Sequence, residues 1–343
     1  MVTLREVARA AGVSLATASR ALSDAPHVSA GNREHVVRTA RELGYRPHHA
    51  ARTLTTGSTA TVGLVLPDLA NPFFATVAKG VQGRARETGR EVIVADTDED
   101  AAQEHEQVAR LLGRVDGLVL CSPRMPADAL AALTATGRVV LVNREAPGVP
   151  SVSFDVPDGV RQAVDHLRAL GHEAVAYAGG PRSSWSDAER RAALDALDGG
   201  GARRTIDLGS FRPTHGGGVQ AADLALAAGA TAVLCFNDLV ALGVLARLHA
   251  RGVRAGRDVS VVGFDDVPAA TLVTPALTTV ALPLARAGRD AVDLLGPGPD
   301  AGSDAGLAAV HRRLPVELVV RASTAPAPAR STAPAADPEV VIR

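Results

Sequence analysis

The sequence contains no long apolar segment and only two cysteines. Because no run of about 18 uncharged apolar residues is present, we expect no membrane-spanning helix. The amino terminus also lacks the basic, apolar and small-residue order of a secretory signal, so we expect a cytoplasmic protein. Cys121 and Cys235 lie far apart, each at the end of an apolar run. We therefore expect two buried, reduced thiols rather than a disulfide or a pair of metal ligands.

Sequence signatures of catalysis are missing as well. There is no G-x-S-x-G, no H-E-x-x-H, no P-loop and no G-x-G-x-x-G after the first predicted strand. Gly216 to Gly218 follow His215 in a predicted loop, where they are not placed to hold a phosphate. The sequence therefore indicates a protein that binds its partners without catalysis and without a cofactor or metal.

What the sequence does contain is enough apolar material for a large core, together with an uneven charge. The 343 residues are 46% hydrophobic and 21% charged, which favours two or three compact units. The net charge is −1, but residues 1–60 carry eight arginines against four acidic residues. The remainder carries 28 basic and 33 acidic residues. A small basic head on an acidic body indicates a polyanionic partner for the head alone.

The first 45 residues contain the start and stop signals of three helices. Thr3 and Glu6 form a capping box, Gly12 can end the helix that follows, and Ser14 can cap the next one. Two short helices joined by a glycine-containing turn, with a third behind them, form a helix-turn-helix; the alternative is an unrelated small helical bundle. The expected helices span residues 4–11, 15–22 and 30–43.

From residue 61, apolar runs alternate with helical stretches. Runs such as TVGLVL and VSVVGF are typical of parallel strands buried on both faces, with helices as crossovers. The strands fall into two groups, residues 61–155 and 172–280, and a last strand begins at residue 315. The pattern predicts two doubly wound α/β lobes with a cleft between them. Beyond Ala322, a Pro/Ala-rich tail is expected to be disordered.

This chain resembles one family of regulators. The matching stretches follow one another in the same order from Val2 to about Arg321. The matching stretches include VTLREVARAAGVSLATASRALS, AARTLTTG, VGLVLPDLANPFF, GHEAVAYAGGP, FNDLVALGVL and DVSVVGFDDVPAATLVTPALTTV. They are similar to those of lactose-repressor-type (LacI/GalR) transcription regulators. The resemblance implies an all-α helix-turn-helix domain, a hinge helix and a two-lobed α/β domain like that of periplasmic sugar-binding proteins. The corresponding ranges are 1–46, 47–60 and 61–321, followed by the tail at 322–343.

The second helix, residues 15–22, has two different faces. Ala18, Ala21 and Leu22 share one face and are expected to pack against the first helix. By resemblance, the other face enters the major groove of DNA, with Leu15, Ala16 and Arg20 at base edges and Thr17 and Ser19 at phosphates. Two alternatives stay open: Leu15 is partly buried in the core, or Arg20 contacts only phosphate. A guanidinium can nevertheless make a bidentate contact to guanine.

The resemblance also implies a hinge helix within residues 47–60. Leu54 matches the leucine that wedges into the central minor groove, and Ala50 and Ala51 are small enough for close approach. Such apolar wedges unstack base steps and bend the DNA, which brings more protein surface into contact. This sequence departs from the family at His48, where Asn is usual. Because histidine is a poorer helix cap than Asn, we expect hinge folding that is weaker or more dependent on DNA and pH.

Polar and aromatic side chains lie where the predicted strands end. The carboxyl ends of parallel strands meet at the cleft, where α/β proteins bind small molecules. Carboxylates, an amide, a guanidinium and aromatic rings suit a sugar, which has hydroxyl groups and apolar C–H faces. We therefore expect effector contacts from Asn71, Phe73, Phe74, Asp155, Arg190, Asn237 and Asp265, and the resemblance adds Phe211 and Trp185. The alternatives are that Phe73 or Phe74 belongs to the core and that Trp185 is merely exposed.

The resulting hypothesis is a homodimeric repressor that binds a near-palindromic DNA operator and responds to a small effector, by family habit a sugar. The tail lacks the leucine heptads that zip dimers into tetramers, so a dimer is expected. Two alternatives stay open: an activator or corepressor-dependent regulator, and a solute-binding protein without DNA function. The sequence leaves open the identity of the effector, the operator and the sign of the ligand's effect.

Overall fold

The computed structural model describes residues 2–22, 28–45, 58–133, 135, 137–198, 204–296 and 309–328. The chain divides into two units, the first ending at Thr59 and the second beginning at Ala60. Among the described residues, no helix is both long and apolar enough to cross a membrane. The same residues contain no cluster of histidine, cysteine and carboxylate side chains arranged to hold a metal ion.

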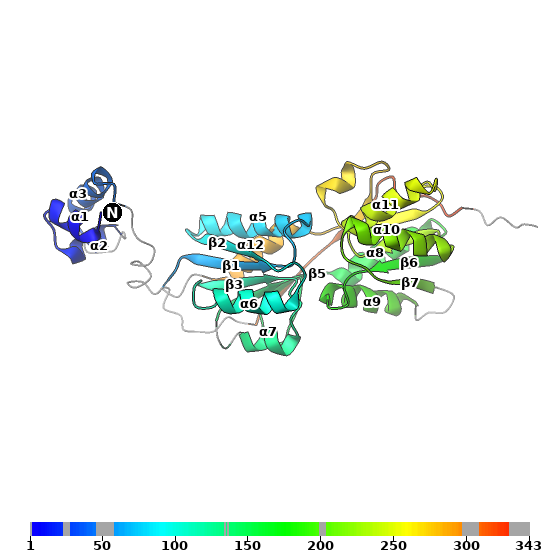
Figure 1. Cartoon of the computed structure of the whole chain (residues 1–343), viewed down its shortest axis with the longest axis horizontal. Coiled ribbons are helices and arrows are strands. Elements are labelled where there is room, and N and C mark those ends of the chain that lie inside the picture. The colour runs from blue at the N-terminus through cyan, green and yellow to red at the C-terminus, as the bar shows by residue number, and fades with distance from the viewer. Residues whose placement is uncertain are drawn as a thin grey trace, which may run out of the picture. The chain divides into compact units, whose positions relative to one another are not determined.

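The first unit has the predicted three helices, α1 (Leu4–Ala10), α2 (Leu15–Leu22) and α3 (Ala30–Glu42), which Figure 1 shows in blue. The capping box is present, because Glu6 N donates to Thr3 Oγ1 over 3.3 Å and Thr3 N donates to Glu6 Oε2 over 2.7 Å. Thr17 N donates to Ser14 Oγ over 3.0 Å and so caps α2. Gly12 has a φ of 63°, which lets the chain turn sharply between α1 and α2.

A small core holds these three helices together. Ala18 and Ala21 are buried against the other two helices and Leu22 is partly buried there, which confirms the inner face predicted for α2. The remaining buried members of this core are Val7, Ala8, Ala11, Val36 and Ala40. Most of these side chains are small, so the helices approach closely and leave the opposite face of α2 outside the core.

Lobe one of the second unit is a six-stranded parallel sheet in the order β11-β5-β4-β3-β1-β2. Figure 1 shows α5 and α12 covering one face and α6 and α7 the other. The strands are β1 (Thr61–Leu66), β2 (Glu91–Asp96), β3 (Gly117–Cys121), β4 (Val139–Val142), β5 (Ser151–Phe154) and β11 (His311–Leu314). The helices are α5 (Pro72–Glu87), α6 (Ala101–Leu111), α7 (Ala127–Leu133) and α12 (Leu284–Leu295).

Lobe two is a second six-stranded sheet, in the order β12-β10-β9-β8-β6-β7, in which only β12 runs antiparallel. Helices α8 and α9 pack against each other, as do α10 and α11. The strands are β6 (Ala174–Gly179), β7 (Arg204–Ser210), β8 (Ala232–Cys235), β9 (Ser260–Asp265), β10 (Thr278–Ala281) and β12 (Glu317–Val319). The helices are α8 (Val156–Ala169), α9 (Trp185–Asp198), α10 (His215–Ala227) and α11 (Asp238–Ala250), with a 3₁₀ turn, η1, at Pro268–Thr271.

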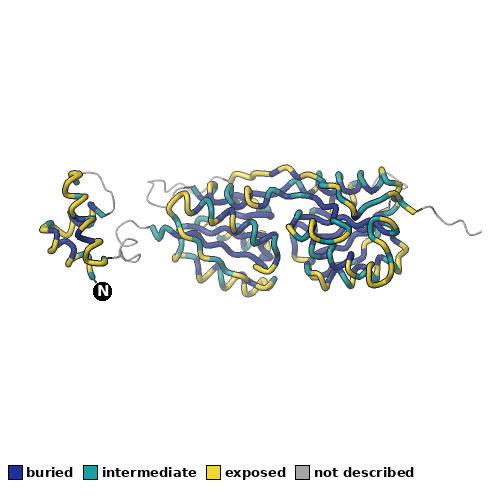
Figure 2. Tube along the Cα trace, turned by 90° about the horizontal axis from the view of Figure 1, so that it is seen from above, coloured by how far each residue is buried: buried dark blue, intermediate teal, exposed yellow. Residues whose placement is uncertain are grey.

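The chain passes between the lobes three times: from β5 to α8, from β10 to α12 and from β11 to β12. Each lobe is therefore discontinuous: the strands within residues 61–155 and 172–280 group as predicted, and β11 adds a later segment to lobe one while β12 adds one to lobe two. One hydrophobic cluster includes residues of both lobes, and the tube in Figure 2 shows buried residues concentrated in the interior of the described chain. Both lobes nevertheless have the predicted doubly wound α/β architecture. Three strands, β7, β10 and β11, were not among the runs predicted as strands; three of the four β11 residues are exposed, so this edge strand has no apolar pattern.

The glycine run Gly216 to Gly218 lies in the first turn of α10 rather than in the predicted loop. A Cβ at Gly218 would lie 1.9 Å from Val240 O, and one at Gly243 would lie 2.0 Å from His215 O. These glycines therefore permit the close packing of α10 on α11.

The segment after Arg321 also differs from its prediction. Ser323 is fully buried, its Oγ donates to Val261 O over 2.6 Å, and it accepts from Thr278 N over 2.8 Å. Ala327 N donates to Leu170 O over 2.8 Å. Residues 322–328 are thus packed on lobe two by backbone pairing that composition does not reveal, whereas residues 329–343 lie outside the described residues.

Both cysteines are free and buried, as predicted. Burial raises the pKa of the Cys121 thiol to about 12, and it raises the pKa of Cys235 as well. At neutral pH both side chains are therefore neutral thiols that fill space in the two sheets.

Candidate functional site

The outer face of α2 presents the side chains predicted to meet DNA. Leu15 is 45% exposed and lies outside the core of its unit, so the alternative of a core role for Leu15 finds no support. Ala16 and Arg20 are exposed, and Thr17 and Ser19 are half-buried. Because small residues dominate this face, the helix can approach base edges closely, with Arg20 as its longest polar side chain.

The first unit also has exposed positive charge outside α2. Four further arginines of α1 and α3 are exposed: Arg5, Arg9, Arg38 and Arg41. Guanidinium groups of this kind neutralise phosphates without reading sequence. The hinge residues Ala51 and Leu54, together with Ala50 and His48, lie outside the described residues.

A pocket open to solvent lies between the two lobes of the second unit. Side chains of both lobes line it, as is usual for clefts in which α/β proteins bind small molecules. Six predicted effector residues line it: Asn71, Phe73, Phe74, Arg190, Asn237 and Asp265. The other lining residues were not predicted: Glu99, Ser122, Arg124, Asn143, Ser184, Ser186, Pro213 and Phe236.

Three predicted residues do not line this cavity. Asp155 caps α8 at an interlobe crossing, where its Oδ1 accepts from Asp158 N over 3.3 Å. Phe211 is 8% exposed and belongs to the hydrophobic core beneath α10. Trp185 is half-buried at the first position of α9, between the lining residues Ser184 and Ser186.

Backbone strain marks the strand ends that meet at the cavity. Ser122 after β3, Asn143 after β4 and Glu99 after β2 have φ values of 47°, 57° and 60°, and Asp265 at the end of β9 has 117°. Non-glycine residues in this region cost free energy and concentrate at functional sites. Ser122 and Asn143 directly follow predicted strands, so the rule that identified Asn237 and Asp265 would have found them too.

On the lobe-two wall, Arg190 is buried but makes only one hydrogen bond within the described residues. Its Nη1 donates to Ser186 O over 2.9 Å, whereas its buried Nε has no partner. The guanidinium carbon lies 4.8 Å from the ring centroid of Phe236 and 4.0 Å from that of Phe264. Two rings therefore hold the cation in place, and N–H groups remain that a ligand can use.

Two buried carboxyl groups, those of Asp265 and Asp238, lie close enough to influence each other, and Asp265 is also influenced by this arginine. Burial raises the pKa of Asp265 well above its usual range; the charge of Asp238 raises it further, and Arg190 opposes both effects. Asp238 accepts hydrogen bonds from Thr279 Oγ1 over 2.6 Å and from Val267 N over 2.8 Å. Burial raises the pKa of Asp238 to about 7. Both carboxyls therefore bind a proton more readily in the folded state than they would in water.

The lobe-one wall combines aromatic and polar side chains. Phe73 and Phe74 pack edge to face with ring centroids 4.9 Å apart, and both belong to the core while also lining the cavity. Asn71 caps α5 by accepting from Phe73 N over 3.0 Å. Asn143 Nδ2 donates to Ser122 Oγ over 2.8 Å. The cavity thus offers apolar rings together with hydrogen-bond donors and acceptors, which is the chemistry that recognises a hydroxyl-rich ligand.

Two family models match separate parts of the chain. The model for bacterial regulatory proteins of the lacI family matches residues 3–48. The model for periplasmic binding proteins and the sugar binding domain of the LacI family matches residues 59–302. Together they cover the helix-turn-helix and most of the two-lobed domain.

Individual relatives match most of the chain. The HTH-type transcriptional regulator GalR of Escherichia coli K12 is 34% identical over 303 residues, which cover 86% of this chain and 88% of GalR. The crystal structure of the lac repressor dimer bound to operator and the anti-inducer ONPF is similar with a TM-score of 0.80 and 30% identity, covering 94% of this chain and 99% of that chain. The transcriptional regulator CelR in complex with cellobiose gives a TM-score of 0.66 and 31% identity, covering 94% and 100%.

A chain that joins a helix-turn-helix to a two-lobed α/β domain with a polar cleft is a ligand-responsive DNA-binding regulator. More specifically, this chain belongs to the LacI family of bacterial transcriptional regulators.

Proposed function

We propose that the chain is a homodimeric repressor of transcription that acts in the cytoplasm and whose affinity for a near-palindromic operator is set by a small hydroxyl-rich effector. The observation that carries this proposal is the cavity, where six residues expected to bind effector converge from the two lobes. CelR is described in complex with cellobiose, and the lac repressor as a dimer on its operator. These similarities support a sugar or sugar derivative as effector and a dimer as the binding form.

Operator binding is assigned to the outer face of α2. Leu15, Ala16 and Arg20 meet base edges, while Thr17 and Ser19 contact phosphates, and Arg20 is the main reader because it can bind guanine with two hydrogen bonds. Two symmetric copies then read two half-sites spaced by the helical repeat of DNA. The exposure of Leu15, Ala16 and Arg20 supports the assignment.

The hinge couples the two sites. Leu54 and Ala51 lie in the minor groove in the DNA-bound state, and closure of the lobes around effector changes the hinge. We divide the chain accordingly into a DNA-binding domain at 1–46, a hinge at 47–60, and an effector domain from 61 that extends through the packed residues 322–328. Because coupling is reciprocal, the factor by which effector changes operator affinity equals the factor by which operator changes effector affinity.

A gel-shift experiment tests DNA binding. The full chain and a truncated chain beginning at Thr59 are compared on DNA selected by the full chain from a random pool. We expect only the full chain to retard the selected DNA; equal binding by both would contradict the proposal and favour a solute-binding protein. Adding sugars to the full-chain complex then gives the sign of the response: release indicates an inducible repressor, and tighter binding a corepressor-dependent one.

We propose no catalytic role. Of the two carboxyls that line the cavity, Glu99 is ion-paired with Arg124, and burial disfavours the charged form of Asp265. We expect every sugar to be recovered unchanged after prolonged incubation with the protein, as measured by chromatography. A converted sugar would contradict this assignment.

A further inference from the structure

The lobe-one wall of the cavity contains an ion pair between Glu99 and Arg124. Neither residue was among the effector contacts expected from the sequence. Arg124 donates from Nε to Glu99 Oε2 over 2.8 Å, and its Nη2 lies 2.7 Å from the same oxygen. The Arg124 side chain is only 4% exposed and that of Glu99 18%. Within the described part of the chain, Glu99 Oε1 is buried and has no hydrogen-bond partner. The pair therefore leaves a charged acceptor atom unsatisfied on a residue that lines the cavity.

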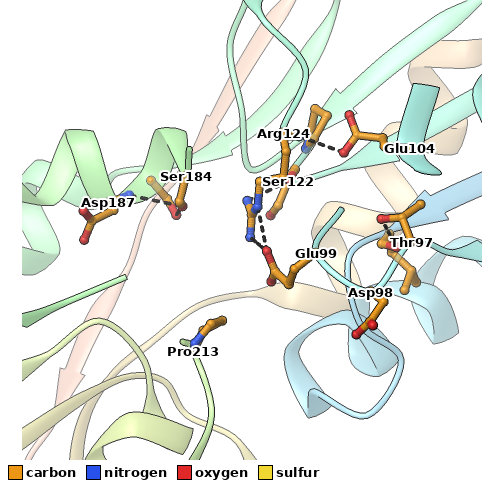
Figure 3. Close-up of polar contacts among 12 residues, drawn as sticks. Thr97, Asp98, Glu99, Glu104, Ser122, Arg124, Ser184, Asp187 and Pro213 are labelled. Atoms are coloured by element: carbon orange, nitrogen blue, oxygen red, sulfur yellow. Dashed lines mark hydrogen bonds and ion pairs between the residues drawn. The ribbon is translucent and has the colours of Figure 1, made fainter. Parts of the chain in front are cut away.

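The loop that carries Arg124 is held rigidly. Glu104 of α6 is buried and accepts from the backbone N of Arg124 over 2.8 Å and of Met125 over 3.1 Å. Arg124 Nη1 donates to Ser122 O over 2.9 Å, which fixes the guanidinium from the other side. Figure 3 shows the Glu99 and Arg124 side chains pointing toward each other, with Ser184 of lobe two across from them. The ion pair is thus positioned before any ligand arrives.

Acidic and basic side chains line the cavity in equal number. In lobe one, Glu99 is ion-paired with Arg124. In lobe two, Asp265 and Arg190 both line the cavity. A ligand with a net charge would enter without a free counter-charge, and burying an uncompensated charge is costly. A neutral ligand with many hydroxyl groups avoids that cost.

We propose that Glu99 and Arg124 together form the lobe-one recognition element of the effector cavity and select an uncharged sugar or polyol over its phosphorylated counterpart. One ligand hydroxyl donates to Glu99 Oε1, and a neighbouring hydroxyl accepts from an Arg124 N–H that is not directed at Glu99 or Ser122. This inference rests on the proposed function, since it names the ligand class of the same cavity.

Titration calorimetry on the full-length protein tests the inference. The probes are ribose with ribose 5-phosphate, glucose with glucose 6-phosphate, and cellobiose. The variants are Glu99→Gln and the double variant Glu99→Gln/Arg124→Met, which removes both charges and leaves no buried ion unpaired. The matched control is Glu106→Gln, which breaks the exposed Arg110–Glu106 ion pair on α6 of the same lobe.

We expect the wild type to bind at least one neutral probe and to bind its phosphorylated partner more weakly. Loss of one hydrogen bond to a charged group weakens binding roughly 10-fold to 100-fold in Glu99→Gln. The double variant loses at least as much, while Glu106→Gln binds as the wild type does. All variants should retain operator binding, which shows that they fold.

Three outcomes overturn the inference: tighter binding of a sugar phosphate than of the neutral sugar, unchanged binding by both cavity variants, or no binding of any probe by the wild type. The proposed function is judged separately, by operator binding of the same wild-type preparation. A chain that binds operator and prefers a phosphorylated sugar remains a regulator, with only the selectivity of its cavity wrongly assigned.

Discussion

Adjacent arginines on α9 offer a sharp test of which side chains serve the cavity. Arg190 lines the cavity and stacks between Phe236 and Phe264. Arg191 instead forms ion pairs with Asp187 over 2.7 Å and with Asp207 over 2.8 Å, and it does not line the cavity. Replacing each by methionine keeps most of the apolar stem and removes the guanidinium.

The two substitutions should have opposite consequences. Arg190 contributes one hydrogen bond, two ring contacts and an electrostatic attraction to Asp265 in the folded state, but burying its charge costs several kcal/mol, so these terms largely offset. We expect Arg190→Met to change Tm by only a few degrees. If effector takes one or two charge-assisted hydrogen bonds from Arg190, each of about 1.5–3 kcal/mol, its Kd rises roughly 10-fold to 10,000-fold.

Arg191→Met should leave effector binding intact and lower stability. The Asp187 side chain is only 3% exposed and would lose its ion-pair partner, although Tyr177 Oη and Gly180 N would still donate to it over 2.7 Å each. An unpaired buried charge costs about 3–5 kcal/mol, and the partial exposure of Arg191 favours the lower end. For a domain of this size, a loss of about 3 kcal/mol lowers Tm by roughly 10 °C.

Thermal denaturation with and without a saturating effector measures both properties in one assay, and a gel shift reports operator release. Arg190→Met should bind operator yet fail to respond to effector at concentrations that act on the wild type. The reasoning is refuted if Arg190→Met keeps the wild-type effector shift, or if Arg191→Met is the variant that loses it.

Three further predictions follow from the same structure. Leu15→Ala should change operator preference in a selection experiment without lowering Tm, because Leu15 is 45% exposed. A fall in Tm with unchanged operator preference would instead show that Leu15 is part of the hydrophobic core. Gly218→Ala should destabilise lobe two by about 1–3 kcal/mol in urea denaturation, because the added Cβ meets Val240 O at 1.9 Å; an unchanged midpoint would refute that packing. The raised pKa values of Asp238 and Asp265 mean that the folded state holds more protons than the unfolded state. These groups should therefore lower the free energy of unfolding of the wild type as pH rises from about 4 through 7. Asp265→Asn should make the free energy of unfolding depend less steeply on pH, and the same dependence in both proteins would contradict the assignment.

Local signals in the sequence determined the helix-turn-helix and most of the strands. Capping at Thr3 and Ser14, the turn at Gly12 and the inner face of α2 depend on residues a few positions apart, so they can be read without tertiary contacts. Buried parallel strands form apolar runs for a similarly local reason, and the side chains at their ends reach the cleft because parallel strands end at one edge. Asn237 and Asp265 were found by this rule.

Tertiary structure decided the rest, because the remaining features depend on residues far apart in the chain. The edge strand β11 has a largely exposed, basic sequence and exists by pairing with β5, about 160 positions earlier. Phe211 follows a strand as a ligand residue would, yet packing under α10 turns it into the core. The Glu99–Arg124 pair lies in loops without a pattern and becomes visible only when two strand ends meet. Sequence spacing thus determined which elements form, and packing between elements determined which side chains share the cavity.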